Sequence, residues 1–233
     1  MPDDHRFALY QELHMRHTAD EAQRIYTAER VLRLLYDKLK FDSVLDVGCG
    51  RGLWLAVAAE LGATQTIGLE GPWIEAKSTY IGVDHILIRD LELSFNLDRS
   101  FDLVMSIEVG EHLSAEAADT FITSLVKHGH FILFSAAIPF QPGTGHINCQ
   151  FPDYWAGLFA KHGYQPLDFI RRAIWSDRGI HMWIRQNVIA FVSAEFMLKN
   201  AWARESASSS GPLSIVHPEL FTALVRTRLA EPG

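Results

Sequence analysis

A short apolar run that leads into a glycine-rich turn is the feature that most restricts the fold of this chain. Residues 43–47 read Ser-Val-Leu-Asp-Val, a composition typical of a buried strand, and Gly48-Cys-Gly-Arg-Gly52 follows directly. Residues 53–61 then have helix-forming composition and end before Gly62, which suits a helix terminus. Leaving a parallel strand and entering a helix within a few residues requires backbone conformations that glycine tolerates. The segment therefore predicts a strand, a tight turn with space for a ligand, and a helix.

The alternation of strands and helices continues along the chain. A helix is expected at residues 18–39, where a capping box at Thr18 and Glu21 precedes apolar residues at helical spacing. Further strands are predicted at residues 65–70, 85–88, 101–107 and 130–136, with a helix capped by Ser114 and ended by Gly129 before the last of them. Strands that alternate with helices imply a parallel sheet covered on both faces.

The C-terminal half is expected to end the sheet with a hairpin. A loop at residues 139–145 and a helix at 152–162 precede two strand-like segments, 166–175 and 182–193. The short connection between these segments, Ser-Asp-Arg-Gly, suits an antiparallel hairpin. Arg185, Gln186 and Asn187 interrupt the second segment, and such polar groups either reach a cavity or face water at a sheet edge.

Three regions are predicted: an N-terminal helical lid or cap segment (1–40), a core (41–195) and a peripheral C-terminal tail (196–233). The lid is suggested by a polar and aromatic cluster, which consists of Tyr10, His14, Arg16, His17 and Tyr26. In the tail, residues 206–211 read as a flexible linker. A short helix at 219–229 would dock either on the body or on a second subunit, as in a homodimer.

The composition restricts the class of partner. The chain has 233 residues, 48% of them hydrophobic, and a net charge of -7 without a run of Lys or Arg. This charge argues against nucleic acid as the main partner and favours a small molecule. Two cysteines are too few for a disulfide framework, and neither a secretory signal nor a membrane span is expected. A cytoplasmic location is predicted.

Acidic residues at strand ends indicate which ligand the turn accepts. Asp46, Glu70 and Asp90 each lie at the carboxyl end of a predicted strand, where ligands bind in open parallel sheets. Glu70 stands twenty residues after Gly50, a spacing at which a carboxylate can bind both ribose hydroxyls of an adenosine. Asp46 would repel a phosphate and attract an ammonium group, which disfavours a dinucleotide. The phosphate-binding pattern G-x-x-x-x-G-K-[ST] is absent.

With these features in place, residues 44–52 resemble the signature of class I S-adenosylmethionine-dependent methyltransferases. The similarity extends from about Tyr26 to Val192 and includes residues 101–113 and 146–155, which look like a bacterial methyltransferase-domain group associated with polysaccharide or secondary-metabolite modification. The resemblance implies an α/β, Rossmann-like, doubly wound sheet of seven strands in the order 3-2-1-4-5-7-6, with strand 7 antiparallel.

The resemblance also implies a set of residues that bind S-adenosylmethionine. The methionine amine and carboxylate would lie near Asp46 and the turn, the ribose on Glu70, the adenine near Asp90 and Leu91, and the sulfonium side near Glu108. The complete predicted set is Asp46, Gly48, Cys49, Gly50, Gly52, Glu70, Asp90, Leu91 and Glu108.

The acceptor side carries two candidate bases, because transfer to a hydroxyl requires removal of its proton. His112 follows the fourth strand, His146 lies in the loop after the fifth, and Glu111 would orient either of them. The expected substrate-binding residues are Glu111, Asn148, Gln150, Tyr154 and Trp155, and no metal site is predicted. We expect O-methylation of a small-molecule or sugar hydroxyl. N-methylation of an amine and a non-catalytic cofactor-binding module stay open as alternatives.

Overall fold

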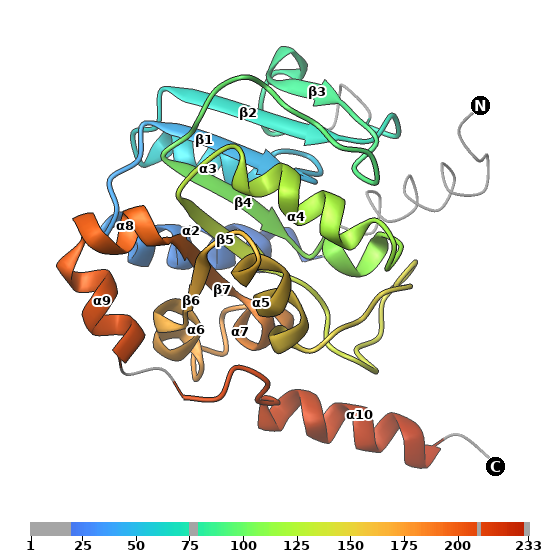
Figure 1. Ribbon diagram of the computed structural model, residues 1–233. Coiled ribbons are helices and arrows are strands. Elements are labelled where there is room, and N and C mark those ends of the chain that lie inside the picture. The colour runs from blue at the N-terminus through green and yellow to red at the C-terminus, as the bar shows by residue number, and fades with distance from the viewer. Residues whose placement is uncertain (1–19, 75–78, 209–210, 231–233) are drawn as a thin grey trace.

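The computed structural model describes residues 20–74, 79–208 and 211–230, and its centre is one seven-stranded sheet (Figure 1). The strand order is β3-β2-β1-β4-β5-β7-β6. Strand β7 runs antiparallel to both of its neighbours, whereas the other pairings are parallel. The predicted order and the antiparallel seventh strand are therefore confirmed.

The strands begin and end close to their predicted positions in the first half of the chain. Their bounds are β1 Ser43–Val47, β2 Gln65–Glu70, β3 Ile86–Ile88, β4 Leu103–Ile107, β5 Phe131–Ser135, β6 Tyr164–Leu167 and β7 Ile189–Ser193. The register pairs Asp46 of β1 with Gly68 of β2 on one side and with Met105 of β4 on the other. This central position places the end of β1 between the ends of its two neighbours.

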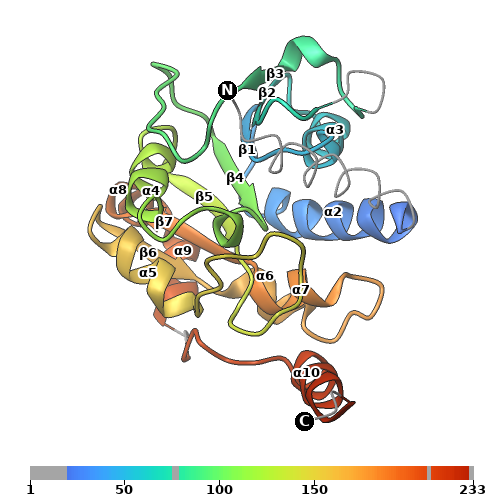
Figure 2. The ribbon, with the colours of Figure 1, turned by 90° about the vertical axis from the view of Figure 1, so that its right-hand side faces the viewer.

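Helices cover both faces of the sheet (Figure 2). Helices α2 (Glu21–Tyr36), α3 (Leu53–Glu60) and α6 (Phe169–Ile174) contribute to one apolar cluster, and α4 (Ala118–Val126) and α5 (Pro152–Ala160) contribute to the other. The remaining elements are the 3-10 turns η2 (Val83–His85) and η3 (Gly110–His112), and helices α7 (Met182–Asn187), α8 (Ala194–Lys199), α9 (Ala201–Ser208) and α10 (Pro218–Ala230). Within the described ranges, no helix has both the length and the hydropathy needed to cross a membrane.

The N-terminal helix α2 is part of the core packing. It starts at Glu21, and its buried residues Ala28, Val31 and Leu32 belong to the apolar cluster under the sheet. Thr18 of the predicted capping box and the first four residues of the predicted lid cluster lie outside the described residues. Tyr26, the fifth member, donates a hydrogen bond from its hydroxyl to Asp177 at 3.1 Å.

The predicted C-terminal hairpin is wrong in its connection. Strand β6 ends at Leu167, and residues 169–174 and 182–187 form helices α6 and α7 where strands were expected. Both helices are only six residues long, and such a run is too short for periodicity to separate a buried helix from a buried strand. The antiparallel β6–β7 pairing exists, but two helices connect its strands.

The polar triplet on α7 is buried and does not face water. Asn187 donates hydrogen bonds to Glu108, and Arg185 donates to Glu219 at 2.8 Å. Gln186 donates to the carbonyl of Ile215 at 2.8 Å and accepts from the backbone of His217. These contacts dock the segment before α10 on α7.

The tail is partly as predicted. Helix α9 runs to Ser208, so the first half of the expected linker is helical, and residues 209–210 lie outside the described part. Helix α10 covers the predicted range with one extra residue at each end. Its Leu220 is buried, which indicates docking on the body, whereas Val225 remains exposed.

A buried ion pair lies at the start of α6. The guanidinium of Arg171 donates to both carboxylate oxygens of Asp168, at 2.8 and 2.6 Å, and also to the carbonyl of Leu213 at 2.9 Å. Arg171 is fully buried and Asp168 nearly so. This bidentate contact balances the two opposite charges in a site that is shielded from water.

We predict that Asp168→Ala destabilises the protein by about 3–5 kcal/mol, because it leaves a buried guanidinium without its counter-charge. Lys161→Ala is the matched control, since it removes an exposed ion pair with Asp119 and should change stability by less than about 1 kcal/mol. Urea unfolding of both variants measures the difference, and equal effects would contradict the assignment.

Candidate active site

A cavity of about 330 Å³ opens at the carboxyl ends of the central strands. It is lined by residues 48–51 of the glycine turn, by Glu70 at the end of β2, by residues 107–109 and 111–113 at the end of β4 and beyond it, and by part of the 141–146 loop. The predicted cofactor residues Asp46 and Gly52 are not among its lining residues. This volume is in the range of pockets that bind small ligands. The location is the one at which open parallel sheets bind ligands.

The turn after β1 requires glycine at three positions. Gly48, Gly50 and Gly52 have φ angles of 80°, 52° and 79°, in the left-handed region that other residues rarely adopt. At Gly48 a Cβ atom would also lie 2.4 Å from a methyl carbon of Val109. The backbone of the turn therefore lies against Val109, just after β4, and the glycine-dependent turn that the sequence predicted is present.

Asp46 is buried in β1, two residues before Gly48 at the start of this turn. Only 2% of its surface is exposed, and its Oδ2 atom has no hydrogen-bond partner among the described residues. Burial, and then the neighbouring Glu70, raise the pKa of Asp46 to about 8. An ammonium group of a ligand would satisfy this carboxylate and restore its charge.

Glu70 holds the turn and still has hydrogen-bonding capacity. Its Oε2 accepts from the backbone N–H of Gly50 at 2.7 Å, and its Oε1 accepts from Gly71 at 2.8 Å and from Trp73 at 2.9 Å. Burial raises the pKa of Glu70, and these hydrogen bonds oppose the increase. Since an oxygen has two lone-pair sites, Oε2 can accept one more bond, for example from a ribose hydroxyl.

Asp90 and Leu91 lie at the far end of the same cavity. The carboxylate of Asp90 is exposed and accepts a hydrogen bond from the backbone of Glu92 at 3.0 Å. Leu91 is buried beside it. An apolar wall next to an acceptor suits an adenine ring with its amino group.

Glu108 lies where β4 ends, on the other side of the cavity. Its φ angle of 55° is unusual for a residue with a side chain, so the backbone is strained at this point. Asn187 donates to its two carboxylate oxygens at 3.1 and 3.3 Å, and Gln141 donates at 3.1 Å. Burial raises the pKa of Glu108.

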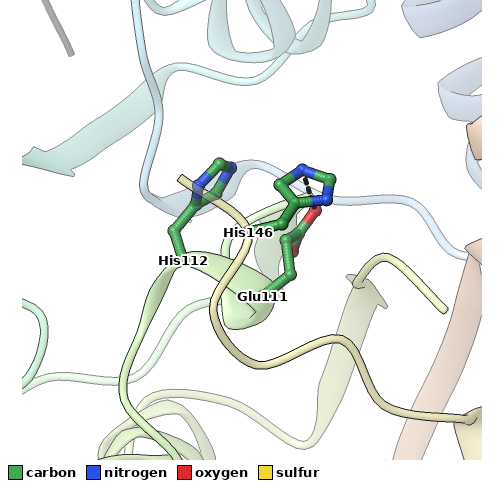
Figure 3. Close-up of side chains that lie close together, drawn as sticks. All are labelled: Glu111, His112 and His146. Atoms are coloured by element: carbon green, nitrogen blue, oxygen red, sulfur yellow. Dashed lines mark ion pairs between the residues drawn. The ribbon is translucent and has the colours of Figure 1, made fainter. Parts of the chain in front are cut away.

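Glu111, His112 and His146 form a cluster next to Glu108 (Figure 3). One ligating atom from each of the three lies within 4.8 Å of the others, and Nε2 of His146 is 3.9 Å from Oε1 of Glu111. The two imidazole rings meet edge to face with centroids 5.0 Å apart. All three residues line the cavity.

Both histidines are oriented through backbone carbonyls. Nδ1 of His112 lies 3.2 Å from the oxygen of Gly145, and Nδ1 of His146 lies 3.2 Å from the oxygen of Gln141. Because a carbonyl oxygen only accepts, Nδ1 carries the proton in each ring and Nε2 carries the lone pair. Burial lowers the pKa of His146, so this imidazole is neutral at pH 7.

Four predicted acceptor residues are not among those that line the cavity, namely Asn148, Gln150, Tyr154 and Trp155. Trp155 is 2% exposed and packs on Phe134, with a ring-centroid distance of 5.2 Å. Its indole also lies against Gly110, where a Cβ atom would come within 2.8 Å. Trp155 thus supports the backbone of η3, which carries Glu111.

The structure adds lining residues that the sequence analysis did not select. Arg24 of α2, Arg51 of the turn and His181 before α7 border the cavity, as does Gln141. Burial lowers the pKa of Arg24. Two cationic side chains beside an acid-rich cavity suit a ligand carboxylate. Arg51 lies within the turn that the sequence analysis identified, but no local pattern marks Arg24, which the distant helix α2 supplies.

Comparison with known proteins identifies the family of the chain. The model of a family described as "Methyltransferase domain" matches residues 15–175. The chain belongs to this methyltransferase family. It is an S-adenosylmethionine-dependent methyltransferase, and the resemblance noted in the sequence is confirmed.

Relatives of the methyltransferase differ in name and share its fold. It is 28% identical over 203 residues to a ubiquinone biosynthesis O-methyltransferase of Xanthomonas euvesicatoria pv. vesicatoria, with 82% of each chain covered. The DhpI–SAH complex has a TM-score of 0.56 at 15% identity and covers 81% of this chain and 95% of its own. DesVI of Streptomyces venezuelae has a TM-score of 0.51 at 14% identity, and the match covers 74% of this chain and 93% of DesVI.

The buried Asp46 gives the ligand-free methyltransferase a defined pH dependence. Folding raises the pKa of this carboxyl from 3.8 to about 8, so the folded state keeps a proton that the unfolded chain releases. The stability that this proton supplies is complete below pH 4 and is lost as the pH rises to 8. The unfolding free energy of the wild type should therefore fall as the pH rises. Asp46→Asn should make this slope shallower by up to about 1.4 kcal/mol per pH unit.

Urea unfolding at pH 5.5, 6.5 and 7.5 tests this prediction. Asp42→Asn is the control, because hydrogen bonds from Thr64 and Gln65 lower the pKa of Asp42, which then titrates below this window. Identical pH slopes for wild type and Asp46→Asn would show that Asp46 is already ionised in the folded protein.

Proposed function

We propose that this methyltransferase transfers a methyl group from S-adenosylmethionine to a hydroxyl oxygen of a small-molecule acceptor. The observation that carries the proposal is the pair of imidazoles, His112 and His146, at the end of the cavity beyond Glu108. A hydroxyl is a weak nucleophile until its proton is removed, whereas a neutral amine needs no such help. Basic nitrogens at the acceptor end therefore favour O-methylation.

In this proposal the cofactor lies along the cavity from Asp90 to Glu108. Asp46 binds the ammonium group, Glu70 binds the ribose, and Leu91 contacts the adenine. Arg24 and Arg51 line the same cavity as the glycine turn and receive the methionine carboxylate. The unpartnered Oδ2 of Asp46 and the open lone pair of Glu70 support this orientation.

The sulfonium then lies near Glu108, and the acceptor approaches from the side of the histidines. His146 lines the cavity, and its Nε2 can accept the hydroxyl proton because Nδ1 donates to the carbonyl of Gln141. The oxygen forms a bond to the methyl carbon as the carbon–sulfur bond breaks, and the electron pair stays on sulfur. Positioning and proton removal are what the protein supplies.

The relatives give independent support for oxygen as the acceptor atom. The two Xanthomonas relatives that cover 82% of this chain are both named as ubiquinone biosynthesis O-methyltransferases. At 28% identity the shared name supports the reaction class, and the acceptor class we propose is a hydroxylated small molecule.

Glu70→Ala is expected to weaken binding of S-adenosylhomocysteine about 10–100-fold, because a hydrogen bond to a charged group contributes roughly 1.5–3 kcal/mol. Glu60→Ala, on the exposed side of α3, should leave the dissociation constant unchanged. Isothermal titration calorimetry measures both. Unaltered affinity in Glu70→Ala would refute the placement of the ribose.

The acceptor is identified by screening phenols, catechols, sugars and primary amines with the cofactor while measuring formation of S-adenosylhomocysteine. On the best hydroxyl acceptor, His146→Ala should lower kcat by about 10²–10⁴-fold, the usual contribution of a proton-transfer group. Its affinity for S-adenosylhomocysteine should stay the same. Turnover of amines alone, unaffected by alanine at His112 and His146, would contradict O-methylation.

A further inference from the structure

Glu111 has an arrangement that neither the fold nor proton removal by a histidine requires. Its side chain is fully buried, and neither carboxylate oxygen accepts a hydrogen bond of normal geometry from the described residues. A second carboxylate, Glu108, lies close enough to raise the pKa of Glu111 further. A buried carboxylate without donors is costly unless a cation or a proton satisfies it.

The two histidines are prepared as ligands on the same side. In metal sites, an imidazole that binds through one nitrogen donates the other N–H to a carbonyl or carboxylate, which fixes the ring. His112 and His146 both make this contact through Nδ1, to Gly145 and Gln141. A proton-transfer group needs one such histidine, and the structure has two with adjoining rings.

The backbone holds the three ligands in register although 34 residues separate His112 from His146. The amides of Ile147 and Asn148 both donate to the carbonyl oxygen of Glu111, at 2.8 and 3.0 Å. The loop that carries His146 is thereby fixed to the turn that carries Glu111 and His112. Figure 3 shows the three side chains converging from these two segments.

We infer that Glu111, His112 and His146 together bind a divalent transition-metal cation, with a coordination position open to the acceptor. Two imidazoles and one carboxylate favour ions such as Zn²⁺, Co²⁺ or Mn²⁺ over Mg²⁺ and Ca²⁺. Ligand atoms at about 2.1 Å from one ion stand about 3–3.4 Å from each other. The observed separations are within 4.8 Å, and small side-chain rotations would shorten them to this value.

The cation deepens the proposed function, and its catalytic role rests on that proposal. A hydroxyl oxygen that binds the ion loses its proton more readily, because the positive charge stabilises the alkoxide or phenolate. The proton passes to water, and the oxygen attacks the methyl carbon as the bond to sulfur breaks. His146 is then a metal ligand, and the ion takes over activation of the hydroxyl.

The test uses Co²⁺ as the probe on the full chain after removal of metals with a chelator. Calorimetry and the visible absorption of Co²⁺ should show one site per chain in the wild type. Glu111→Gln and His146→Ala should each weaken Co²⁺ binding at least about tenfold. Any variant that no longer binds S-adenosylhomocysteine is replaced by His112→Asn, so that loss of folding is not mistaken for loss of a ligand.

His130→Ala is the matched control. His130 lies 3.6 Å from Glu195 in an exposed pair, so this variant shows whether Co²⁺ binds to any histidine and glutamate that happen to be neighbours. It should bind Co²⁺ like the wild type. Equal affinity of wild type, Glu111→Gln and His146→Ala, or an equal loss in His130→Ala, would overturn the metal site.

Activity separates this inference from the proposed function. If hydroxyl methylation continues undiminished in the metal-free protein but fails in His146→Ala, the metal inference is wrong and proton removal by His146 stands. If Co²⁺ binds as expected but only amines are methylated, the metal site stands and the proposed O-methylation fails. Hydroxyl methylation that falls on metal removal and returns with Co²⁺ supports both.

Discussion

The cavity depends on one hydrogen bond between neighbouring strand ends, from the backbone N–H of Gly50 to the carboxylate of Glu70. At 2.7 Å it joins the turn after β1 to the end of β2. The amides of Gly48 and Cys49 donate to the carbonyl of Leu69 beside it. Since the three glycines carry no side chain, the turn can lie against both strands and leave space above for a ligand. The same carboxylate that shapes the turn is thus available to bind the cofactor.

The acids in and around the cavity form two groups with different chemistry. Asp46 and Glu70 lie at the ends of β1 and β2 beside the glycine turn, where a raised pKa and an unpartnered oxygen suit a cationic ligand with hydroxyl groups. Glu108 and Glu111 follow β4 and lie beside two imidazoles. In the proposed function the first group binds the methyl donor, the second faces the acceptor, and the methyl group is transferred near Glu108.

The sequence predicted the strand ends and the glycine turn well because these elements are fixed locally. A strand followed by a glycine turn places Asp46 and Glu70 at strand ends whatever the distant packing. The acceptor side depends on tertiary contacts: backbone bonds between Glu111 and the 146–148 loop bring the histidines together. Trp155 was predicted to contact the acceptor, yet it packs on Gly110, a contact that no spacing reveals. The prediction of the C-terminal hairpin was wrong because α6 and α7 are six-residue helices, too short for helical periodicity to be recognised.

A crystal structure of the chain with S-adenosylhomocysteine tests the central claim most directly. The account predicts the amino group on Asp46, the ribose hydroxyls on Glu70, and the sulfur directed toward Glu108 and the cluster of Glu111, His112 and His146. A cofactor bound in the reverse direction, with its adenine against the histidines, would contradict the division of the cavity into donor and acceptor ends.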